Sequence, residues 1–317
     1  MVRWVVLVWW AWAQAAAAPC LPAERGALAL APDGRSVAVV AAGAVWAGEP
    51  LRPIMPVQAV AGTRLVFGDD GILLIWDSDG LWSTDLKTPP VRRLEGSALA
   101  PALARVRGRT GVVLDQGLAL AEKDFEFKRF ECSTAAWRNA IDLTGAPRMA
   151  LGHANDCGDP EGMVLATLRH APSEAGLTLT PGPSDLADLL GASAGWFHAS
   201  QWVVTTEPGG GHHALIALRP GPKKVQRVVL GRFGTLGPFG VAPDQQSAVV
   251  WADGAVVRLE GDRAPRRLPG PSGLVTALAT SGTTQAALTE AGLVHSTAEG
   301  GWRVVLEACS PPASDPK

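Results

Sequence analysis

A fixed spacing of turn residues constrains the fold of this chain more than any other sequence feature. Five pairs of turn positions are each nine residues apart, namely Gly34 and Gly43, Gly71 and Gly80, Gly108 and Gly117, Gln245 and Gly254, and Thr283 and Gly292. The short apolar runs 72–76 and 111–114, which lie between such turns, have the length of single β-strands. Each pair therefore predicts two turns around one strand, and so a repeated hairpin.

The hairpins recur at an interval that gives the length of a repeating unit. Gly34, Gly71 and Gly108 are spaced by 37 residues, and Gln245 and Thr283 by 38. A further strand is predicted 21 residues after the first turn, where cations recur as Arg92 and Arg93, Arg129, and Arg266 and Arg267. Charge at this position suits an edge strand, because it opposes pairing with another molecule. Units of about 40 residues with four strands are typical of propeller blades.

The interval also predicts the number of units. A further 37 residues from Gly108 lead to Gly145, and the 100 residues from there to Gln245 have room for two units with insertions, the second near Gly195. We therefore expect an all-β fold, a β-propeller of seven four-stranded blades, as one domain over 18–309 with a disordered tail over 310–317. The composition agrees, because Gly and Pro, about a fifth of the 317 residues, favour turns over long helices.

Two of the turns resemble a motif of a known class of propellers. Ala31-Pro32-Asp33-Gly34 and Ala242-Pro243-Asp244 are similar to the Ser-Pro-Asp-Gly turn of WD-like (WD40-like) propellers in exported bacterial proteins, such as the periplasmic propeller of the Tol-Pal system. In those families the turn joins the innermost strand of a blade to the second. The segment 296–302 also resembles the Asp-box turn of sialidase-like propellers, with Ala298 in place of the aspartate. The resemblance implies a fold and not membership of a family.

The amino terminus has the three zones of a secretory signal peptide, with a short cationic start, an apolar run and four alanines that end at Ala18. Because Pro19 would obstruct cleavage after Ala18, we expect a signal peptide over 1–17 and a periplasmic or secreted protein. An uncleaved anchor is an alternative, but the 15 residues from Trp4 to Ala18 fall short of the ~20 that span a bilayer. Lipidation at Cys20 is a minority alternative, from whose usual pattern Pro19 departs.

The four cysteines predict disulfides, because their number is even and the chain is expected to be exported. Three pairings are possible. We favour Cys132 with Cys157, and Cys20 with Cys309, which would join the two ends of the mature chain. No strand exchange between the ends is evident, so this second bridge would close the ring covalently.

Two irregular loops are candidate metal sites. The loop 153–162 contains three carboxylates, which suit calcium, but it lacks the alternating ligands of a calcium loop, and we interpret it as a polar surface loop pinned by Cys157. The insertion 207–213 ends in His212 and His213, which suit zinc. Adjacent histidines in a strand point to opposite faces, so we interpret this insertion as a hairpin tip. We expect no metal and no cofactor.

Two further patterns suggest chemistry that the context does not support. The segment 191–195 fits the Gly-x-Ser-x-Gly string of serine hydrolases around Ser193, but it lies at a predicted blade opening and not between a strand and a long helix. Eight tryptophans recur near blade centres and suggest either sugar platforms or packing between blades, of which we favour packing; they are Trp46, Trp76, Trp82, Trp137, Trp196, Trp202, Trp251 and Trp302.

Charge and hydropathy exclude two classes of partner. A net charge of −2 and an isoelectric point near 6.3 offer no basic surface to nucleic acid, and the mature chain has no apolar stretch of 18 residues that could span a membrane. We expect a non-enzymatic exported scaffold that binds an envelope protein or a glycan through its loop faces. The alternative is a propeller-type hydrolase or lyase with a carboxylate or metal site in the central channel. The innermost strands 27–30 and 274–278 carry no charge, which favours binding, and no catalytic residue is predicted.

Overall fold

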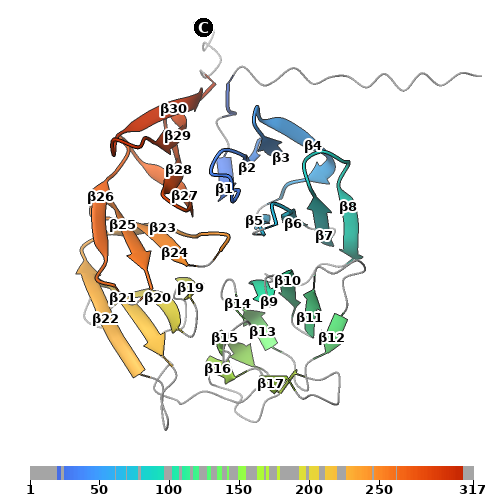
Figure 1. The fold of residues 1–317 in the computed structure, drawn as a ribbon, viewed down its shortest axis with the longest axis vertical. Helices are drawn as coiled ribbons and strands as arrows, with labels where there is room; N and C mark the ends of the chain where they lie inside the picture. Colours follow the sequence, from blue (N-terminus) through green and yellow to red (C-terminus); the bar gives the residue numbers. More distant parts are fainter. Residues whose placement is uncertain are drawn as a thin grey trace, which may run out of the picture.

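The computed structural model describes residues 20–22, 25–60, 62–68, 70–77, 80–95, 211–219, 226–244, 246–261 and 263–309, and between 96 and 210 it describes the strands alone. Side chains are described in the same ranges except 94–95 and 218–219. The regular elements in these residues are β-strands, and their sheets stand around a ring (Figure 1). The predicted all-β propeller arrangement is therefore confirmed. Within these ranges, no helix has the length and apolar character needed to cross a membrane.

Four blades are described with their side chains, and each has four antiparallel strands in sequence order from the centre of the ring outwards (Figure 1). The first blade consists of β1 (Arg25–Leu30), β2 (Val37–Ala41), β3 (Ala44–Gly48) and β4 (Arg52–Gln58). The second consists of β5 (Arg64–Phe67), β6 (Leu73–Asp77), β7 (Gly80–Thr84) and β8 (Val91–Glu95).

The other two complete blades end the chain. The penultimate blade consists of β23 (Leu236–Val241), β24 (Ser247–Ala252), β25 (Ala255–Glu260) and β26 (Arg266–Pro269). The last blade consists of β27 (Val275–Ser281), β28 (Thr284–Thr289), β29 (Gly292–Ser296) and β30 (Trp302–Glu307). A further four-stranded sheet precedes them, with β19 (Ser193–Phe197), β20 (Ser200–Thr206), β21 (His213–Arg219) and β22 (Gln226–Phe233).

The predicted count of seven four-stranded blades needs correction, because the strands between β8 and β19 form sheets of five, three and two strands. The five-stranded sheet contains β9 (Ala102–Val106), β10 (Arg109–Leu114), β11 (Gly117–Leu120), β12 (Phe127–Arg129) and β14 (Ile141–Asp142). The smaller sheets contain β13 (Thr134–Trp137), β15 (Met149–Ala154) and β16 (Met163–Thr167), and β17 (Arg169–His170) and β18 (Leu177–Thr178).

The physical reason for this difference is a parallel pairing that a regular spacing of turns does not predict. Strand β14 pairs in parallel with β9, Ile141 opposite Ala104, so it joins the sheet that precedes it. The nine-residue spacing also ends at Gly117 and resumes at Gln245. The structure thus shows four complete blades, and not seven, in the part where side chains are described.

In the complete blades the predicted turns and outer strands are confirmed. Gly43 and Gly254 lie in the turns between second and third strands with φ of 71° and 73°, a conformation that glycine adopts without strain. The paired cations Arg92 and Arg93 lie on β8, and Arg266 and Arg267 lie on β26, each the outermost strand of its blade. The spacing of residues in the sequence therefore predicted both the hairpins and the outermost strands of these sheets.

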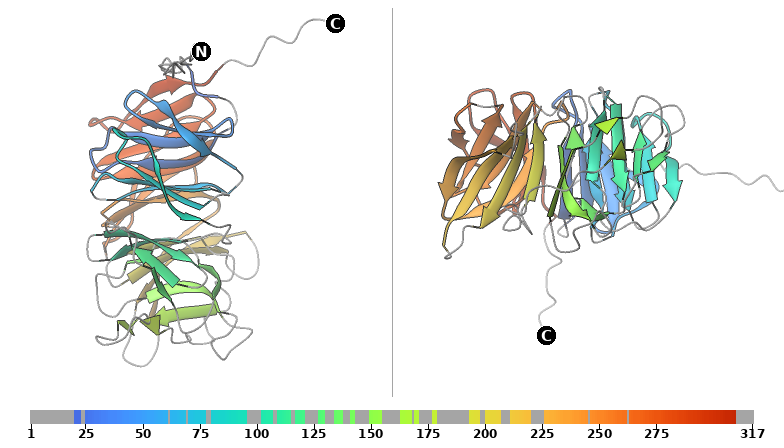
Figure 2. Two further views of the ribbon diagram at one scale, coloured as in Figure 1. Left: turned by 90° about the vertical axis from the view of Figure 1, so that its right-hand side faces the viewer. Right: turned by 90° about the horizontal axis from the view of Figure 1, so that it is seen from below.

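The hydrophobic core lies between neighbouring blades. One cluster joins the first and second blades through side chains such as Val45, Phe67 and Ile75. Another joins the penultimate and last blades through Val249, Val256 and Leu278. Neighbouring described blades thus share their buried side chains, and the sheets follow one another around the disc seen edge-on in Figure 2.

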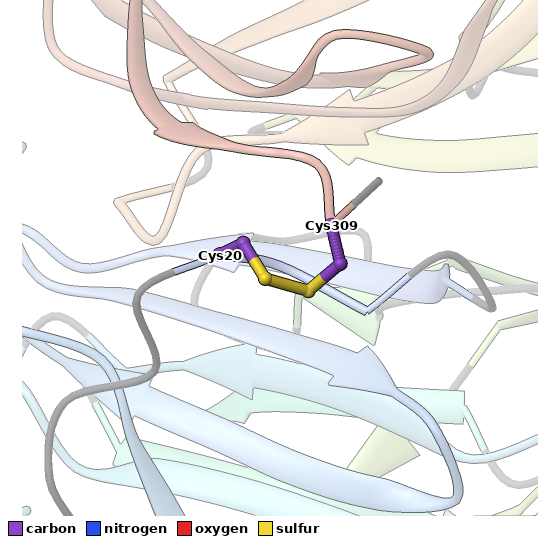
Figure 3. The surroundings of a disulfide bond; sticks show 2 residues. All are labelled: Cys20 and Cys309. Carbon is purple, nitrogen blue, oxygen red and sulfur yellow. A yellow bond between two sulfur atoms is a disulfide. The ribbon is translucent and has the colours of Figure 1, made fainter. Parts of the chain in front are cut away.

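The last blade meets the first at what we call the closing junction, and a disulfide joins Cys20 to Cys309 there with an S–S distance of 2.04 Å (Figure 3). This predicted pairing is confirmed. The lipidation alternative is wrong for this structure, because one sulfur cannot form both a disulfide and a thioether. Cys132 and Cys157 lie outside the described residues.

The closing junction also contains a backbone contact that the sequence did not reveal. Leu21 pairs in parallel with Ala308, donating its N–H to Glu307 O and accepting the N–H of Cys309 at 2.7 and 2.8 Å. Its side chain, 1% exposed, packs in a cluster with Leu30 of the first blade and Leu293 of the last. The expectation that no strand exchange joins the ends therefore needs correction: a one-residue bridge accompanies the disulfide.

A side chain of the first blade completes the closing junction. The guanidinium of Arg25, the first residue of the innermost strand β1, donates to the carbonyl oxygens of Thr289 and Glu290 in the last blade. The hydroxyl of Ser281 in turn donates to Pro32 O across the same junction, at 3.2 Å. The first and last blades are thus held by covalent, backbone and side-chain bonds at once.

Candidate functional site: the turn face

One face of the ring carries the turns that join the first strand of each complete blade to the second and the third to the fourth, and we call it the turn face. Because the strands alternate in direction, all turns of these two kinds point to the same side, and the opposite side carries the remaining turns. The strands of the ring run between these two loop-bearing faces (Figure 2).

An aspartate recurs in the inner turn of three of the four complete blades. The Oδ1 of Asp33 accepts the backbone N–H of Arg35 at 2.8 Å and that of Ser36 at 2.9 Å. Asp70 accepts from Ile72 at 3.0 Å, and Asp244 from Gln246 at 2.9 Å. The side chain of each aspartate thereby replaces a backbone acceptor and fixes the turn. The three carboxylates stand at equivalent positions of their blades.

The hydrogen bonds of Asp33 also favour the charged form of its carboxylate. Partial burial alone would raise the pKa of Asp33, but the N–H groups of Arg35 and Ser36, the Ser36 hydroxyl and the nearby Arg35 cation outweigh it and hold the pKa below its usual value. Asp85, in the outer turn after β7, has a lowered pKa because the N–H and hydroxyl of Thr88 and the N–H of Lys87 donate to it. The turn face therefore presents anionic groups at neutral pH.

The opposite face has its own carboxylate cap. Asp253, between β24 and β25, accepts the N–H of Thr235 at 2.7 Å and its hydroxyl at 3.2 Å. The hydrogen bond from the Thr235 N–H lowers the pKa of Asp253. Slight desolvation opposes this effect, and the Thr235 hydroxyl and the Arg267 cation add to it. Arg267 also donates to Asp253 O at 2.7 Å. Asp253 therefore caps a turn on the opposite face, whereas Asp33, Asp70 and Asp244 repeat at the inner turns of the turn face.

The innermost strands of the complete blades are mainly apolar, as the sequence predicted, apart from two arginines. Strands β23 and β27 carry no ionisable residue, and β1 and β5 each carry one, Arg25 and Arg64, at their first residue. Arg25 bonds the carbonyls of the last blade and so has a structural role. In the complete blades, most ionisable residues therefore lie on the turns and the outer strands and not along the innermost strands.

The described tryptophans pack between blades. Trp46 packs against the cluster of the closing junction, Trp82 against that of the first two blades, and Trp251 and Trp302 against that of the last two. Trp76 is 5% exposed. Packing is therefore the role of these five side chains, as favoured above, and their faces are not open platforms. Trp137, Trp196 and Trp202 have no described side chains.

The remaining sequence candidates fall mainly outside the described side chains. The loop residues 155–162 and the segment 207–210 lie outside the described residues, while His212 is exposed and His213 is half-buried on β21. Among the described residues, no three histidine, cysteine or acidic side chains gather as a metal site would require. Ser193 is the first residue of strand β19, which differs from the strand-to-helix turn of a nucleophile serine.

Sequence reasoning missed one buried polar side chain. His295 on β29 is 8% exposed, and its Nε2 has no hydrogen-bond partner among the residues that the structure describes. Burial lowers its pKa, the cation of Arg303 adds to this, and the carboxylate of Glu49 in the first blade opposes it. His295 thus faces the closing junction as a neutral side chain. Its lone position in the sequence gave no signal of this setting.

The chain matches no model of a known protein family and no curated protein sequence. Among solved structures it resembles Kuenenia stuttgartiensis hydrazine synthase at 11% identity and a TM-score of 0.52, over 91% of this chain and 96% of that one. It also resembles the extracellular domain of a protein described as a one-component system from B. thetaiotaomicron, at 12% identity and a TM-score of 0.50, over 88% of this chain and 48% of that one.

A third likeness, to the PorZ surface component of the type-IX secretion system of Porphyromonas gingivalis, has 13% identity and a TM-score of 0.34, over 91% of this chain and 42% of that one. The chain thus spans less than half the length of two of these three proteins. At such identities the likenesses to hydrazine synthase and to the extracellular domain concern the fold alone.

Proposed function

We propose that this chain is an exported, non-enzymatic β-propeller that binds an envelope protein or a glycan through its loop faces. The observation that carries the proposal is the turn face, where Asp33, Asp70 and Asp244 repeat at equivalent positions of a rigid ring. The apolar inner strands position these turns, and the charged groups lie where a partner can reach them. A protein with a basic surface fits this face best, since the described tryptophans are used in packing.

The proposal includes export to the periplasm or the medium, with a signal peptide over 1–17, a mature domain over 18–309 and a tail over 310–317. The Cys20–Cys309 disulfide supports an oxidising compartment. The repeated aspartate turns support the WD-like, Tol-Pal-type character of the blades. Amino-terminal sequencing of the secreted or periplasmic protein should begin at Ala18, and a start at Met1 would contradict the export proposal.

The binding proposal is tested by removing charge without removing the turn caps. In D33N/D70N/D244N each amide oxygen can still accept the backbone N–H, but three negative charges are lost. The mature protein, immobilised and incubated with a detergent-solubilised envelope fraction, should capture a partner, and the triple variant should capture it at least ~10-fold less, which corresponds to ~1.4 kcal/mol.

The variant D253N is the matched control, because it neutralises a capping aspartate on the opposite face. It should capture the partner as well as the wild type. Equal capture by the triple variant would contradict a role for the turn face. Turnover of a glycan or ester substrate by the wild type would favour the alternative, a hydrolase or lyase.

A further inference from the structure

The outermost strands of the four-stranded sheets differ in how well their edges are protected. An exposed strand edge offers unpaired backbone N–H and C=O groups, and prolines or charged side chains discourage other chains from pairing with it. Strand β4 contains Pro53 and Pro56, and β8 contains two consecutive arginines. Strand β26 begins with two arginines and ends at Pro269. These three edges are protected by sequence.

Two other edges share an apolar sequence. Strands β22 and β30 both contain Arg-Val-Val-Leu, at 227–230 and 303–306. Val229 on β22 is 45% exposed, and Val304 and Val305 on β30 are 47% and 48% exposed. Each strand has one arginine before its valines, one charged residue after them (Arg232 on β22 and Glu307 on β30), and no proline. The edge of β30 therefore exposes two adjacent valines where β4, β8 and β26 place proline or charge.

Strand β30 already accepts another segment at its outer edge. Leu21 pairs with Ala308 one residue beyond the end of β30, and its N–H donates to Glu307 O. The disulfide of the preceding residue, Cys20, holds this bridge in place. The edge from Trp302 to Leu306 continues beyond the bridge, with a bulge at Val305 where the register of β30 against β29 shifts.

The charges on β30 favour a particular occupant. Arg303 and Glu307 are both exposed and lie four residues apart, so a second copy of β30 could in principle pair antiparallel with Arg303 opposite Glu307. That pairing would place Trp302 of the second copy opposite Ala308, where Leu21 is already bonded. A separate extended segment that ends before Ala308 meets no such conflict. It would need a carboxylate near Arg303 and β-branched side chains near the valines.

We propose that the outer edge of β30 binds an extended segment of a partner protein by strand addition, with a carboxylate of that segment beside Arg303. Main-chain hydrogen bonds to this edge, which no other described strand pairs with, supply affinity, and the side chains of Arg303, Val304 and Val305 supply specificity. A glycan does not have the backbone amides for this pairing. The edge lies on the rim, away from both loop faces, so the inference is independent of the partner proposed for the turn face.

The test uses the full mature protein and two fluorescein-labelled pentapeptides, Glu-Val-Thr-Val-Thr and Thr-Val-Thr-Val-Glu, which place the carboxylate at either end. We expect one of them to bind saturably in fluorescence anisotropy, and which one binds gives the direction of the added strand. The variant V304K/V305K should weaken this binding at least ~10-fold, because charge protects an edge. If neither peptide binds saturably at concentrations up to ~1 mM, the proposal is overturned. A Kd of ~1 mM corresponds to a binding free energy of about −4 kcal/mol.

Two controls make the test specific. M55K adds a lysine at a side chain 68% exposed on the proline-containing strand β4 and should leave binding unchanged. R303E should weaken binding of the glutamate peptide and strengthen binding of the same peptide with lysine in place of glutamate. Equal effects of M55K and V304K/V305K would overturn the proposal. So would a dimer in light scattering that V304K/V305K dissociates, because the occupant would then be a second copy of the chain.

Discussion

The closing junction and the junction between the penultimate and last blades, which we call the internal junction, join neighbouring blades by different means. In the internal junction, Arg258 donates to Gly282 O at 2.6 Å and Trp302 Nε1 to Pro269 O at 2.9 Å. The chain itself connects these two blades. In the closing junction no short connection exists, and the disulfide, the Leu21 bridge and the Arg25 bonds are present instead. A ring of blades thus needs bonds wherever chain continuity is absent.

The two junctions also differ at one equivalent position of the third strand. Register places Arg258 opposite Val249 and His295 opposite Ala286, each three residues from the end of its strand pair. Arg258 reaches the next blade and pairs with Glu260 at 2.6 Å. His295 faces the first blade without a partner for its Nε2. At this position the internal junction has an arginine that is bonded to the next blade, and the closing junction has a histidine whose pKa is lowered by burial.

The largest expected effect is the loss of the disulfide. In C20S/C309S the unfolded chain regains the freedom that a bridge across 289 residues removes, which in the chain-entropy model costs about 4 kcal/mol or more. Urea unfolding should show a lower midpoint, and the wild type under reducing conditions should match the variant. An unchanged midpoint would mean that the Leu21 and Arg25 contacts alone hold the closing junction.

A smaller effect is expected from a bulkier residue in the internal junction. A Cβ at Gly240 on β23 would overlap the carbonyl oxygen of Leu278 on β27, so G240A should force the inner strands apart and cost ~1–3 kcal/mol in urea unfolding. G234A is the control, because its Cβ would meet Asp253 Oδ1 at an ordinary 3.5 Å. Equal stability of the two variants would contradict the close approach of the inner strands.

The smallest effect is a pH dependence confined to the closing junction. Burial lowers the pKa of His295 in the folded protein, so below about pH 6.5 the unfolded chain binds the proton more readily and folding loses stability. Thermal unfolding temperatures between pH 7.5 and 5 should therefore fall more steeply for the wild type than for H295Q. The two slopes should agree within error if His295 is not buried in a neutral form, and that result would contradict the prediction.

Local patterns accounted for much of the fold and little of the site. The spacing of Gly34, Gly71 and Gly254 predicted hairpins because a turn is set by a few neighbouring residues, and Arg92 and Arg266 marked the outer strands for the same reason. The parallel pairing of β14 with β9 was not predictable, because it joins residues 37 apart through no turn motif. For the site, the Asp33 and Asp244 turns were recognised as blade markers, and their place on one anionic face required the ring.

The sequence by itself predicted the hairpins and outer strands of the complete blades and supplied the cysteines for the link between Cys20 and Cys309, because turn conformations and cysteine content are properties of short segments and composition. Only the tertiary structure decided what meets across the closing junction. Leu21, Arg25 and His295 lie in sequence with no distinctive motif, and each interacts with residues more than 240 positions away in the chain. The physical reason is that the two ends of the chain meet only when the whole ring has formed. Their contacts therefore do not follow the repeat of the blades and produce no periodic pattern in the sequence.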